Sequence, residues 1–524
     1  MKIIFYLLSL NHRGIRMSRT CTLQVGIILA LMLSQSSVSF AQSTIYQTDF
    51  DELSDRVEWT NNPNASWVRE DVKGGTCLRV TNAGMVTKAI DLRKYAGMKV
   101  AFRCLVKSEN VSTPNQTYLG VKFMLHYKSG DKDFWKNQDN IWGTFDWKYV
   151  FFSLIIPENI SDSKLYLGLQ GSTGKAWFDN ISVNIIKEPT ARQIRDLGVN
   201  KSRTKYRGVM SPVKFHEKDL QILAGWNVNL IRWQLTGNKP VLGNNPKDSI
   251  IYNNWLDQKL NDLDKVTSVC KKYGIKVIVD LHSVPGGRGS DGVNRMFYDH
   301  SFNKRFIETW KYIAIRYKKN AAILGYDLVN EPMQDTLPPK GLDYYTTQKA
   351  AAQEIRKIDR YKKIFIETED GASPTDFNFL KPMPLSNIVY EVHMYHPLAY
   401  THQGVLYEKT GIEYPGLVSD HYYDKSSLRR ILQPVRDFQL AYKVQIFVGE
   451  FSAVRWAPGS ARYINDCIEI FEEYGWDWTY HAYREWHGWD VEYADSSRQM
   501  IKPSYNTSRK KVLLKWFEKN ERGI

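Results

Sequence analysis

The sequence predicts an α/β protein in which a (β/α)8 barrel over residues 204–524 follows an all-β sandwich over residues 44–186. Two observations predict this division. Short runs of alternating polar and apolar residues, separated by Asn, Gly, Ser and Pro, fill the first region and are typical of a β-sandwich. Beyond residue 204, eight apolar strand-like runs alternate with amphipathic helical segments, and eight is the number of strands in a (β/α)8 barrel.

The sandwich region ends in two apolar runs, over residues 165–170 and 176–183. These closing strands resemble those of jelly-roll carbohydrate-binding modules of the family 4, 9 and 22 type. The resemblance implies a jelly-roll sandwich and leaves two roles open, because many such domains are structural spacers that bind no sugar.

Residues 187–203 are predicted to be a polar linker between the two domains. The strands expected after it are 206–210, 228–235, 275–282, 323–330, 364–369, 388–395, 444–450 and 476–483. Helices are expected between them, for example over 255–273, 302–319, 345–358, 427–442 and 462–474. A doubly wound open sheet is the alternative fold, but the sequence has no Gly-rich phosphate loop to support it.

Composition excludes some classes of partner. Aromatic residues make up 13% of the chain; they can fill a large core, and their faces can also stack on sugar rings. The net charge is +15, yet the basic residues are scattered and their longest cluster is Arg509-Lys510-Lys511. Because a nucleic-acid footprint requires a clustered basic surface, no nucleic-acid partner is expected.

The N-terminus has the pattern of an export signal. Basic residues precede an apolar run over residues 25–33, and the small residues Ser39 and Ala41 follow. This pattern predicts a signal peptide over residues 1–41 and a secreted or periplasmic protein. The run is too short for a membrane span, although a retained signal anchor is the alternative. The start of translation is open between Met1 and Met17.

Four cysteines follow the expected cleavage site. Cys77 and Cys104 fall in the same β-rich region and are candidates for a disulfide. Cys270 and Cys467 lie in amphipathic helical segments and are expected to be buried thiols. No Cys/His spacing is typical of a zinc site, and no metal or cofactor is expected.

Two glutamates each close a short apolar run: Glu331 in residues 325–332 and Glu450 in residues 444–451. In a barrel of this type, chemistry takes place at the carboxyl ends of the strands. Glycoside hydrolysis requires at least two acids, and the strand ends would supply both. One carboxylic acid protonates the leaving oxygen, and one carboxylate attacks the sugar carbon.

Other polar and aromatic residues stand at further strand ends. They are Arg232 on the second strand, His282 on the third, Asn330 on the fourth, His393 and Tyr395 on the sixth, and Trp486 after the eighth. With the two glutamates, they make residues 204–520 resemble glycoside hydrolase family 5, as does the segment 401–404. This resemblance implies a secreted retaining glycosidase that cleaves β-linked plant-type polysaccharide or oligosaccharide through a glycosyl-enzyme intermediate, without a metal or cofactor.

The resemblance implies that Glu331 is the acid/base and Glu450 the nucleophile. An acid has to stay protonated near neutral pH, so the pKa of Glu331 is expected to be raised. A nucleophile has to stay ionised. Arg232 and the hydroxyl of Tyr395 are suited to stabilise the Glu450 carboxylate.

The resemblance also implies roles in sugar binding. Asn330 is expected to hold the sugar 2-hydroxyl, a bond that strengthens in the transition state. His282 and His393 are expected to bind sugar hydroxyls or to orient the glutamates, and Trp486 to offer a face to the sugar ring. The family places an aromatic residue where His481 stands, so the sugar platform of this chain departs from the pattern.

Five further acids stand near strand ends. Asp280, Asp327 and Glu391 precede their strand ends by a few residues and are expected to serve the structure, whereas the roles of Glu367 and Glu369 stay open. Two other functions are alternatives for such a barrel. A non-catalytic polysaccharide-binding protein would be favoured by loss of either catalytic glutamate, and a barrel lyase or aldolase would need a Schiff-base lysine or metal ligands at a strand end. The sugar, its linkage, endo or exo action and the oligomeric state stay open.

Overall fold

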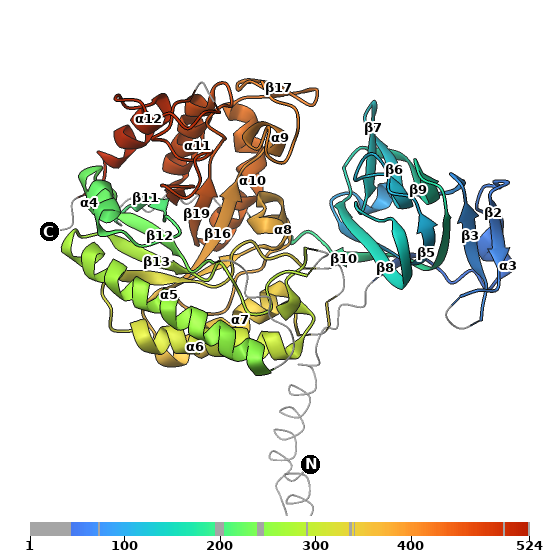
Figure 1. The fold of residues 1–524 in the computed structure, drawn as a ribbon, viewed down its shortest axis with the longest axis horizontal. Helices are drawn as coiled ribbons and strands as arrows, with labels where there is room; N and C mark the ends of the chain where they lie inside the picture. The colour runs from blue at the N-terminus through green and yellow to red at the C-terminus, as the bar shows by residue number, and fades with distance from the viewer. Residues whose placement is uncertain are drawn as a thin grey trace, which may run out of the picture.

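The computed structural model describes residues 43–521, apart from 72–73, 194–203, 238–245, 290–291, 335–337, 340 and 496–497. The expected signal peptide and residues 194–203 of the expected linker lie outside the described residues. The described chain forms a β-sandwich and a β/α barrel that lie side by side (Figure 1). None of its helices has both the length and the hydropathy that a membrane crossing requires.

Two antiparallel sheets form the sandwich. The first has the strand order β2-β3-β10-β5-β8, with β1 also paired to β10, and the second has the order β4-β9-β6-β7. The elements are β1 (Thr44–Thr48), α3 (Leu53–Val57), β2 (Ala65–Val68), β3 (Cys77–Thr81), β4 (Met85–Ala89), η2 (Arg93–Tyr95), β5 (Lys99–Val111), β6 (Gly120–Ser129), β7 (Lys132–Asn137), β8 (Gly143–Ile155), β9 (Ile160–Gln170) and β10 (Lys175–Lys187). Inward-facing residues such as Phe102, Phe123 and Leu167 pack between the sheets, because side chains alternate between the two faces of a strand.

The possible disulfide in this domain is not formed. Cys77 and Cys104 are both free and buried, and so are Cys270 and Cys467 in the barrel. Cys104 packs within the core between the two sheets. The sandwich is therefore stabilised by its apolar core, without a covalent link between these strands.

Eight parallel strands close the barrel in the order β11-β12-β13-β14-β15-β16-β19-β20. The strands are β11 (Arg207–Met210), β12 (Leu230–Gln234), β13 (Lys276–Asp280), β14 (Ile323–Asp327), β15 (Lys363–Glu367), β16 (Ile388–Met394), β19 (Gln445–Phe451) and β20 (Asp477–Tyr480). Each of the eight overlaps an expected strand, so the predicted (β/α)8 fold is confirmed.

Helices surround the barrel, and the longer expected helices are present. They are α4 (Glu217–Gly225), α5 (Pro246–Lys272), α6 (His300–Tyr317), α7 (Tyr344–Ile358), α10 (Lys425–Tyr442), α11 (Ser460–Tyr474) and α12 (Ser508–Phe517). Aspartates begin three of them: Asp299, Asp343 and Asp424 each accept a hydrogen bond from a backbone N–H of the first turn. Such caps satisfy donors that the helix itself leaves unpaired.

Several barrel strands are followed by segments with their own secondary structure. The segment after β13 contains η3 (Arg295–Phe297), and the segment after β15 contains α8 (Glu369–Ala372) and η4 (Pro374–Phe379). The segment after β16 contains α9 (Leu398–Thr401) and the hairpin of β17 (Gly416–Val418) and β18 (His421–Tyr423). These segments surround the carboxyl ends of the strands, where a barrel of this type places its active site.

Candidate active site

Alternating side chains build the interior of the barrel in layers. An apolar cluster contains one residue from each of five strands: Leu230, Ile278, Phe365, Val389 and Phe447. Because side chains on one face of a strand recur every second residue, the residues two positions further along these strands form the next layer. Four of these positions hold charged residues and the fifth, on β19, is Gly449, while Asp327 of β14 lies level with Asp280 in the register of the sheet. Here we call Arg232, Asp280, Asp327, Glu367 and Glu391 the charged layer; all five are buried.

Arg232 is the centre of the charged layer. Its guanidinium nitrogens lie 2.7 Å from a carboxylate oxygen of Asp327, 3.1 Å from Glu367 and 3.2 Å from Glu391. A further nitrogen lies 3.4 Å from Asp280. A buried arginine with so many carboxylates stays charged and fixes their positions, because five N–H donors in a rigid plane can serve several acceptors at once.

Gly449 makes room for the charged layer on β19. A Cβ at this position would lie 1.6 Å from Oε1 of Glu391 and 3.1 Å from Nε2 of His393. Only a residue without a side chain fits here, and the space it leaves is filled by a carboxylate and an imidazole. Gly449 immediately precedes Glu450, so the same close approach positions that glutamate.

Glu450 lies above the charged layer and is held from two sides. Arg232 donates to its Oε1 from Nη1 at 2.8 Å, and the hydroxyl of Tyr395 donates to its Oε2 at 2.7 Å. Nitrogens of His393 and His481 lie 3.8 and 3.7 Å from the same carboxylate. Burial raises the pKa of Glu450, but these cations together lower it by a larger amount. The net pKa therefore lies well below the ordinary value. The carboxylate is therefore ionised, as a nucleophile requires.

Glu331 follows β14 in a left-handed backbone conformation, with φ of +46°. Its backbone N–H donates to Oε2 of Glu367 at 2.7 Å, and its carbonyl oxygen accepts from Arg288 at 2.6 Å. Its side chain is 31% exposed, in contrast to the buried Glu450. Non-glycine residues with positive φ are strained and persist where surrounding contacts hold them, and here the contacts leave this carboxyl accessible to a ligand.

The raised pKa expected for Glu331 is wrong for the unliganded site. Burial is the largest single effect and raises the pKa, but the hydrogen bond with His393 Nδ1, at 3.2 Å, and the charges of His393 and Arg288 together lower it by more, so the net pKa lies below the ordinary value. The pKa of His393 itself is well above the ordinary value: burial opposes its charge, but Glu450 and Glu367 favour it. The proton expected on Glu331 is therefore held by the neighbouring imidazole.

The two carboxylates are close to each other. Glu331, His393 and Glu450 each offer an atom that lies within 4.8 Å of the other two. Glu367, Glu391 and His393 meet the same limit, which is a spacing at which carboxylates and imidazoles can hold a metal ion. In the second group, the guanidinium of Arg232 already lies against both carboxylates and supplies their positive charge.

His282 and Asn330 lie beside the glutamates. His282 Nδ1 is 2.9 Å from Asp280, and its Nε2 is 3.4 Å from Asn330 Nδ2. Asn330 Oδ1 accepts from Arg232 at 3.0 Å. Both side chains are partly exposed while one end of each is fixed by the charged layer, so they can offer polar atoms to a ligand in a defined orientation.

His481 and Glu485 join the site as well. His481 Nδ1 is 2.5 Å from the Tyr395 hydroxyl, and its Nε2 is 2.9 Å from Glu485. Burial lowers the pKa of His481, but Glu450 and Glu485 raise it, with a net increase. Sequence reasoning noted His481 only as a departure from the family pattern and did not select Glu485 or Arg288. No spacing in the sequence marks these two, because both follow strands in irregular segments.

Trp486 lies within a cluster of aromatic rings next to the site. Its ring contacts those of Trp456 and Trp489, with centroids 5.9 and 5.2 Å apart. Trp489 is the ring that reaches Tyr395 and His481, at 6.2 and 5.8 Å. Trp486 is therefore connected to the side chains around Glu450 through the buried ring of Trp489.

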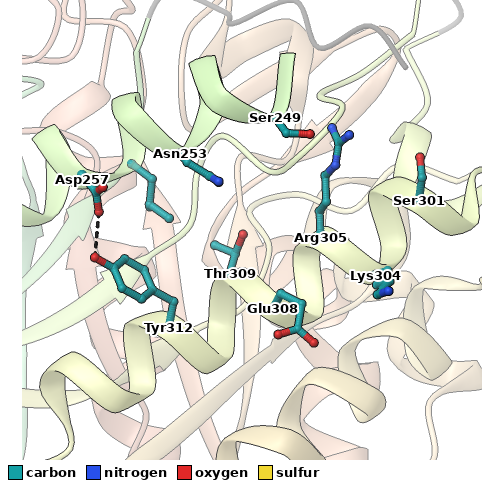
Figure 2. Close-up of a pocket in the computed structure, with 10 residues that line it drawn as sticks. Ser249, Asn253, Asp257, Ser301, Lys304, Arg305, Glu308, Thr309 and Tyr312 are labelled. Atoms are coloured by element: carbon teal, nitrogen blue, oxygen red, sulfur yellow. Dashed lines mark hydrogen bonds between the residues drawn. The ribbon is translucent and has the colours of Figure 1, made fainter. Parts of the chain in front are cut away.

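A separate hollow of about 650 Å³ lies on the outside of the barrel between α5 and α6 (Figure 2). Asn253 and Asp257 of α5 and Arg305, Glu308 and Tyr312 of α6 line it. Asp257 accepts a hydrogen bond from Tyr312 at 2.8 Å. The residues that line this hollow come from outer helices, and it is distinct from the constellation at the strand ends.

The barrel is similar to known proteins. A family model described as cellulase (glycosyl hydrolase family 5) matches residues 195–491. Endoglucanase C of Acetivibrio thermocellus is 25% identical over 296 residues, which cover 50% of this chain and 83% of that protein. Cellodextrinase A of Ruminococcus flavefaciens is 28% identical over 194 residues, covering 36% and 53%. A solved structure of Thermotoga maritima Cel5A in complex with cellobiose is 20% identical, covers 59% of this chain and 97% of that one, and has a TM-score of 0.47.

Proposed function

The chain belongs to the cellulase family, glycosyl hydrolase family 5, and we propose that it cleaves a β-linked glucan with retention of anomeric configuration. Membership makes it a glycoside hydrolase. The choice of glucan is supported by the curated relatives, which include endoglucanases and a cellodextrinase. The export pattern over residues 1–41 supports action outside the cytoplasm, in the periplasm or the medium.

The separation of the two glutamates is the observation that carries the proposal of retention. An inverting enzyme holds its carboxyl groups about 6.5–9.5 Å apart to admit a water molecule, whereas a retaining enzyme holds them about 5–5.5 Å apart. Oxygens of Glu331 and Glu450 within 4.8 Å of each other leave no room for that water. One carboxylate then has to attack the sugar itself.

In the first step, Glu450 attacks the anomeric carbon while the bond to the leaving oxygen breaks. The ionised carboxylate suits this role because Arg232 and Tyr395 fix both of its oxygens. The leaving oxygen takes a proton from Glu331. In the free enzyme that proton is on His393, 3.2 Å from Glu331, so the two groups act as one acid that titrates as a pair.

In the second step, a water molecule takes the place of the leaving group and attacks the same carbon. Glu331 accepts the proton of this water, as microscopic reversibility requires. The ester bond to Glu450 breaks, and the carboxylate is regenerated beside Arg232. The carbon is inverted twice, and the product keeps the configuration of the substrate.

Proton NMR of the first-formed product tests the mechanism. We expect the β-anomer to appear first from a β-linked glucan oligosaccharide and the α-anomer to accumulate only later, as mutarotation proceeds. A parallel assay on a panel of soluble glucans, xylans and mannans identifies the substrate. First appearance of the α-anomer would exclude the double displacement while leaving the family assignment intact.

Replacement of Glu331 by alanine is expected to separate substrates by their leaving group. A general acid contributes about 10²- to 10⁴-fold, so kcat/KM for phenyl β-cellobioside should fall by that order. For 2,4-dinitrophenyl β-cellobioside, whose leaving group needs no proton, kcat/KM should change little, because it reports the first step. The value of kcat should fall, because the second step still needs Glu331 as the base for water. Azide should restore turnover of this substrate and give the β-glycosyl azide.

The matched control for this variant is Glu354→Ala. Glu354 lies on α7 and pairs with Lys357 on the protein surface, so its replacement removes a carboxylate of the same kind far from the strand ends. Both substrates should be cleaved at the unaltered rate. An equal loss on both aryl glycosides in the Glu331 variant would contradict its assignment as the acid/base.

A further inference from the structure

A buried group of charges joins the sandwich to the barrel. Lys99 begins β5 and Lys187 ends β10, and the two are paired across the first sheet. Lys99 Nζ donates to Glu369 at 2.7 Å and to Asp376 at 3.0 Å, and Lys187 Nζ lies 2.6 Å from Glu369. We refer to these four residues as the interdomain cluster. Figure 1 shows α8, which begins with Glu369, on the side of the barrel that faces the sandwich.

The two acids of this cluster have little contact with solvent. Their side chains are 4% and 1% exposed for Glu369 and Asp376, respectively. Burial raises the pKa of Glu369, but Lys187 and Lys99 together lower it by a larger amount, and the net pKa is about 2. A buried carboxylate without a partner costs several kcal/mol. For Asp376, burial raises the pKa to about 6 even though Lys99 lowers it. The lysines of the sandwich therefore keep Glu369 charged at the rim of the barrel and oppose the effect of burial on Asp376.

The segment that these acids anchor lies against the proposed acid/base. Glu367, two residues before Glu369, accepts the hydrogen bond from the backbone of Glu331. Gly371, two residues after it, donates from its backbone to the carbonyl oxygen of Pro332 at 3.3 Å. A Cβ on Gly371 would lie 4.0 Å from the carboxyl carbon of Glu331. The segment thus contacts Glu331 on both sides of Glu369.

The backbone of this segment is held in an uncommon conformation. Asp370, Gly371 and Ala372 have φ values of +58°, +70° and +58°. Two of the three are not glycine, and such residues cost about 1–3 kcal/mol each when held in this region. Contacts on the flanks have to maintain it. Ion pairs of Glu369 before the turn and Asp376 after it are placed to do so.

We propose that Lys99 and Lys187 of the sandwich are positioning residues for the acid/base glutamate of the barrel. The inference rests on the proposed role of Glu331. It gives the N-terminal domain a part in each turnover, because the domain supplies the cations that hold the segment against which Glu331 is oriented. The effect is independent of any binding of polysaccharide by the sandwich, so it applies to small soluble substrates.

The test uses the full chain with Lys99→Met and Lys187→Met combined. Methionine keeps an unbranched apolar side chain in the interface and removes both charges. We expect kcat/KM for phenyl β-cellobioside to fall about tenfold or more, since misplacement of a catalytic group by an ångström can cost about 10²-fold. The value for 2,4-dinitrophenyl β-cellobioside should fall less than about twofold, because its cleavage needs Glu450 but no proton.

Two further variants make the result specific. Lys136→Met with Lys164→Met removes two exposed lysines of the same domain and should leave both substrates unaffected. Adding Glu369→Gln and Asp376→Asn to the Lys99 and Lys187 variant removes the unpaired charges, and it should restore a large part of the activity on the phenyl glycoside. A purely structural contact between domains would not produce this dependence on the leaving group.

The outcomes separate this inference from the proposed function. Glu331→Ala is measured in the same assay. If it discriminates between the two glycosides and the double lysine variant does not, the positioning role is overturned and the acid/base assignment stands. Equal losses on both glycosides in the lysine variant would also overturn the positioning role. If Glu331→Ala itself fails to discriminate, the proposed function is at fault.

Discussion

Replacement of Glu450 by alanine is expected to abolish turnover on every substrate, with a fall in kcat of about 10⁴-fold or more. The loss should be the same for phenyl and 2,4-dinitrophenyl glycosides, because no leaving group is good enough to replace the attacking carboxylate. Steady-state rates on both glycosides measure it. This lack of discrimination distinguishes the Glu450 variant from Glu331→Ala.

Azide provides the control within the same variant. It can enter the space that the missing carboxylate leaves, on the face of the sugar opposite the leaving group, and should give the α-glycosyl azide. Glu473 is a half-exposed residue of α11 that pairs with Arg429 of α10, and Glu473→Ala should leave the rate unchanged. Retention of most activity by Glu450→Ala would show that another group is the nucleophile.

Replacement of Arg232 by methionine is expected to lower the free energy of unfolding by about 3–5 kcal/mol, the usual cost of removing one partner from a buried ion pair. The side chain is fully buried and lies within 3.4 Å of the carboxylates of Asp280, Asp327, Glu367, Glu391 and Glu450. Without it, these acids lose their shared cation. Urea unfolding followed by tryptophan fluorescence measures the change.

The matched substitution is Arg316→Met. Arg316 pairs with the half-exposed Asp264 between α5 and α6, and pairs of this kind contribute about 0–1 kcal/mol. Any fraction of Arg232→Met that stays folded should also lose activity, because Glu450 loses its donor at 2.8 Å. A change in stability below about 1 kcal/mol for Arg232→Met would mean that protonation of the carboxylates compensates for the missing cation.

The barrel could be predicted because its buried parallel strands are continuous apolar runs. The expected ends were less accurate than the strands themselves. The fourth strand was expected to extend through residue 330, but β14 ends at Asp327. The next residues leave the sheet and carry Glu331 over the end of the barrel, in a turn that is fixed by contacts with Glu367 and Arg288. An apolar pattern carries no information about such contacts.

The two glutamates and their immediate neighbours could be selected from the sequence because each stands at a strand end. Arg232 was expected to stabilise Glu450, and in the structure it also binds the acids of the charged layer. The expectation for the pKa of Glu331 failed for a related reason: the effect of His393 depends on a distance that the sequence does not state. Glu485 and Lys99 could not be selected, since one lies in an irregular segment and the other in a different domain.

The charged layer has a consequence for the whole catalytic cycle on the proposed mechanism. In the first step, the pair of His393 and Glu331 gives up one proton, while Glu450 exchanges its negative charge for a neutral ester. One change adds a negative charge to the barrel interior and the other removes one, so the total is constant. The second step reverses both. Each half-reaction is therefore electroneutral for the protein, and the buried carboxylates around Arg232 do not have to take up or release protons to solvent between steps. Charges that are already in place and need no rearrangement during the reaction are the most effective at stabilising a transition state.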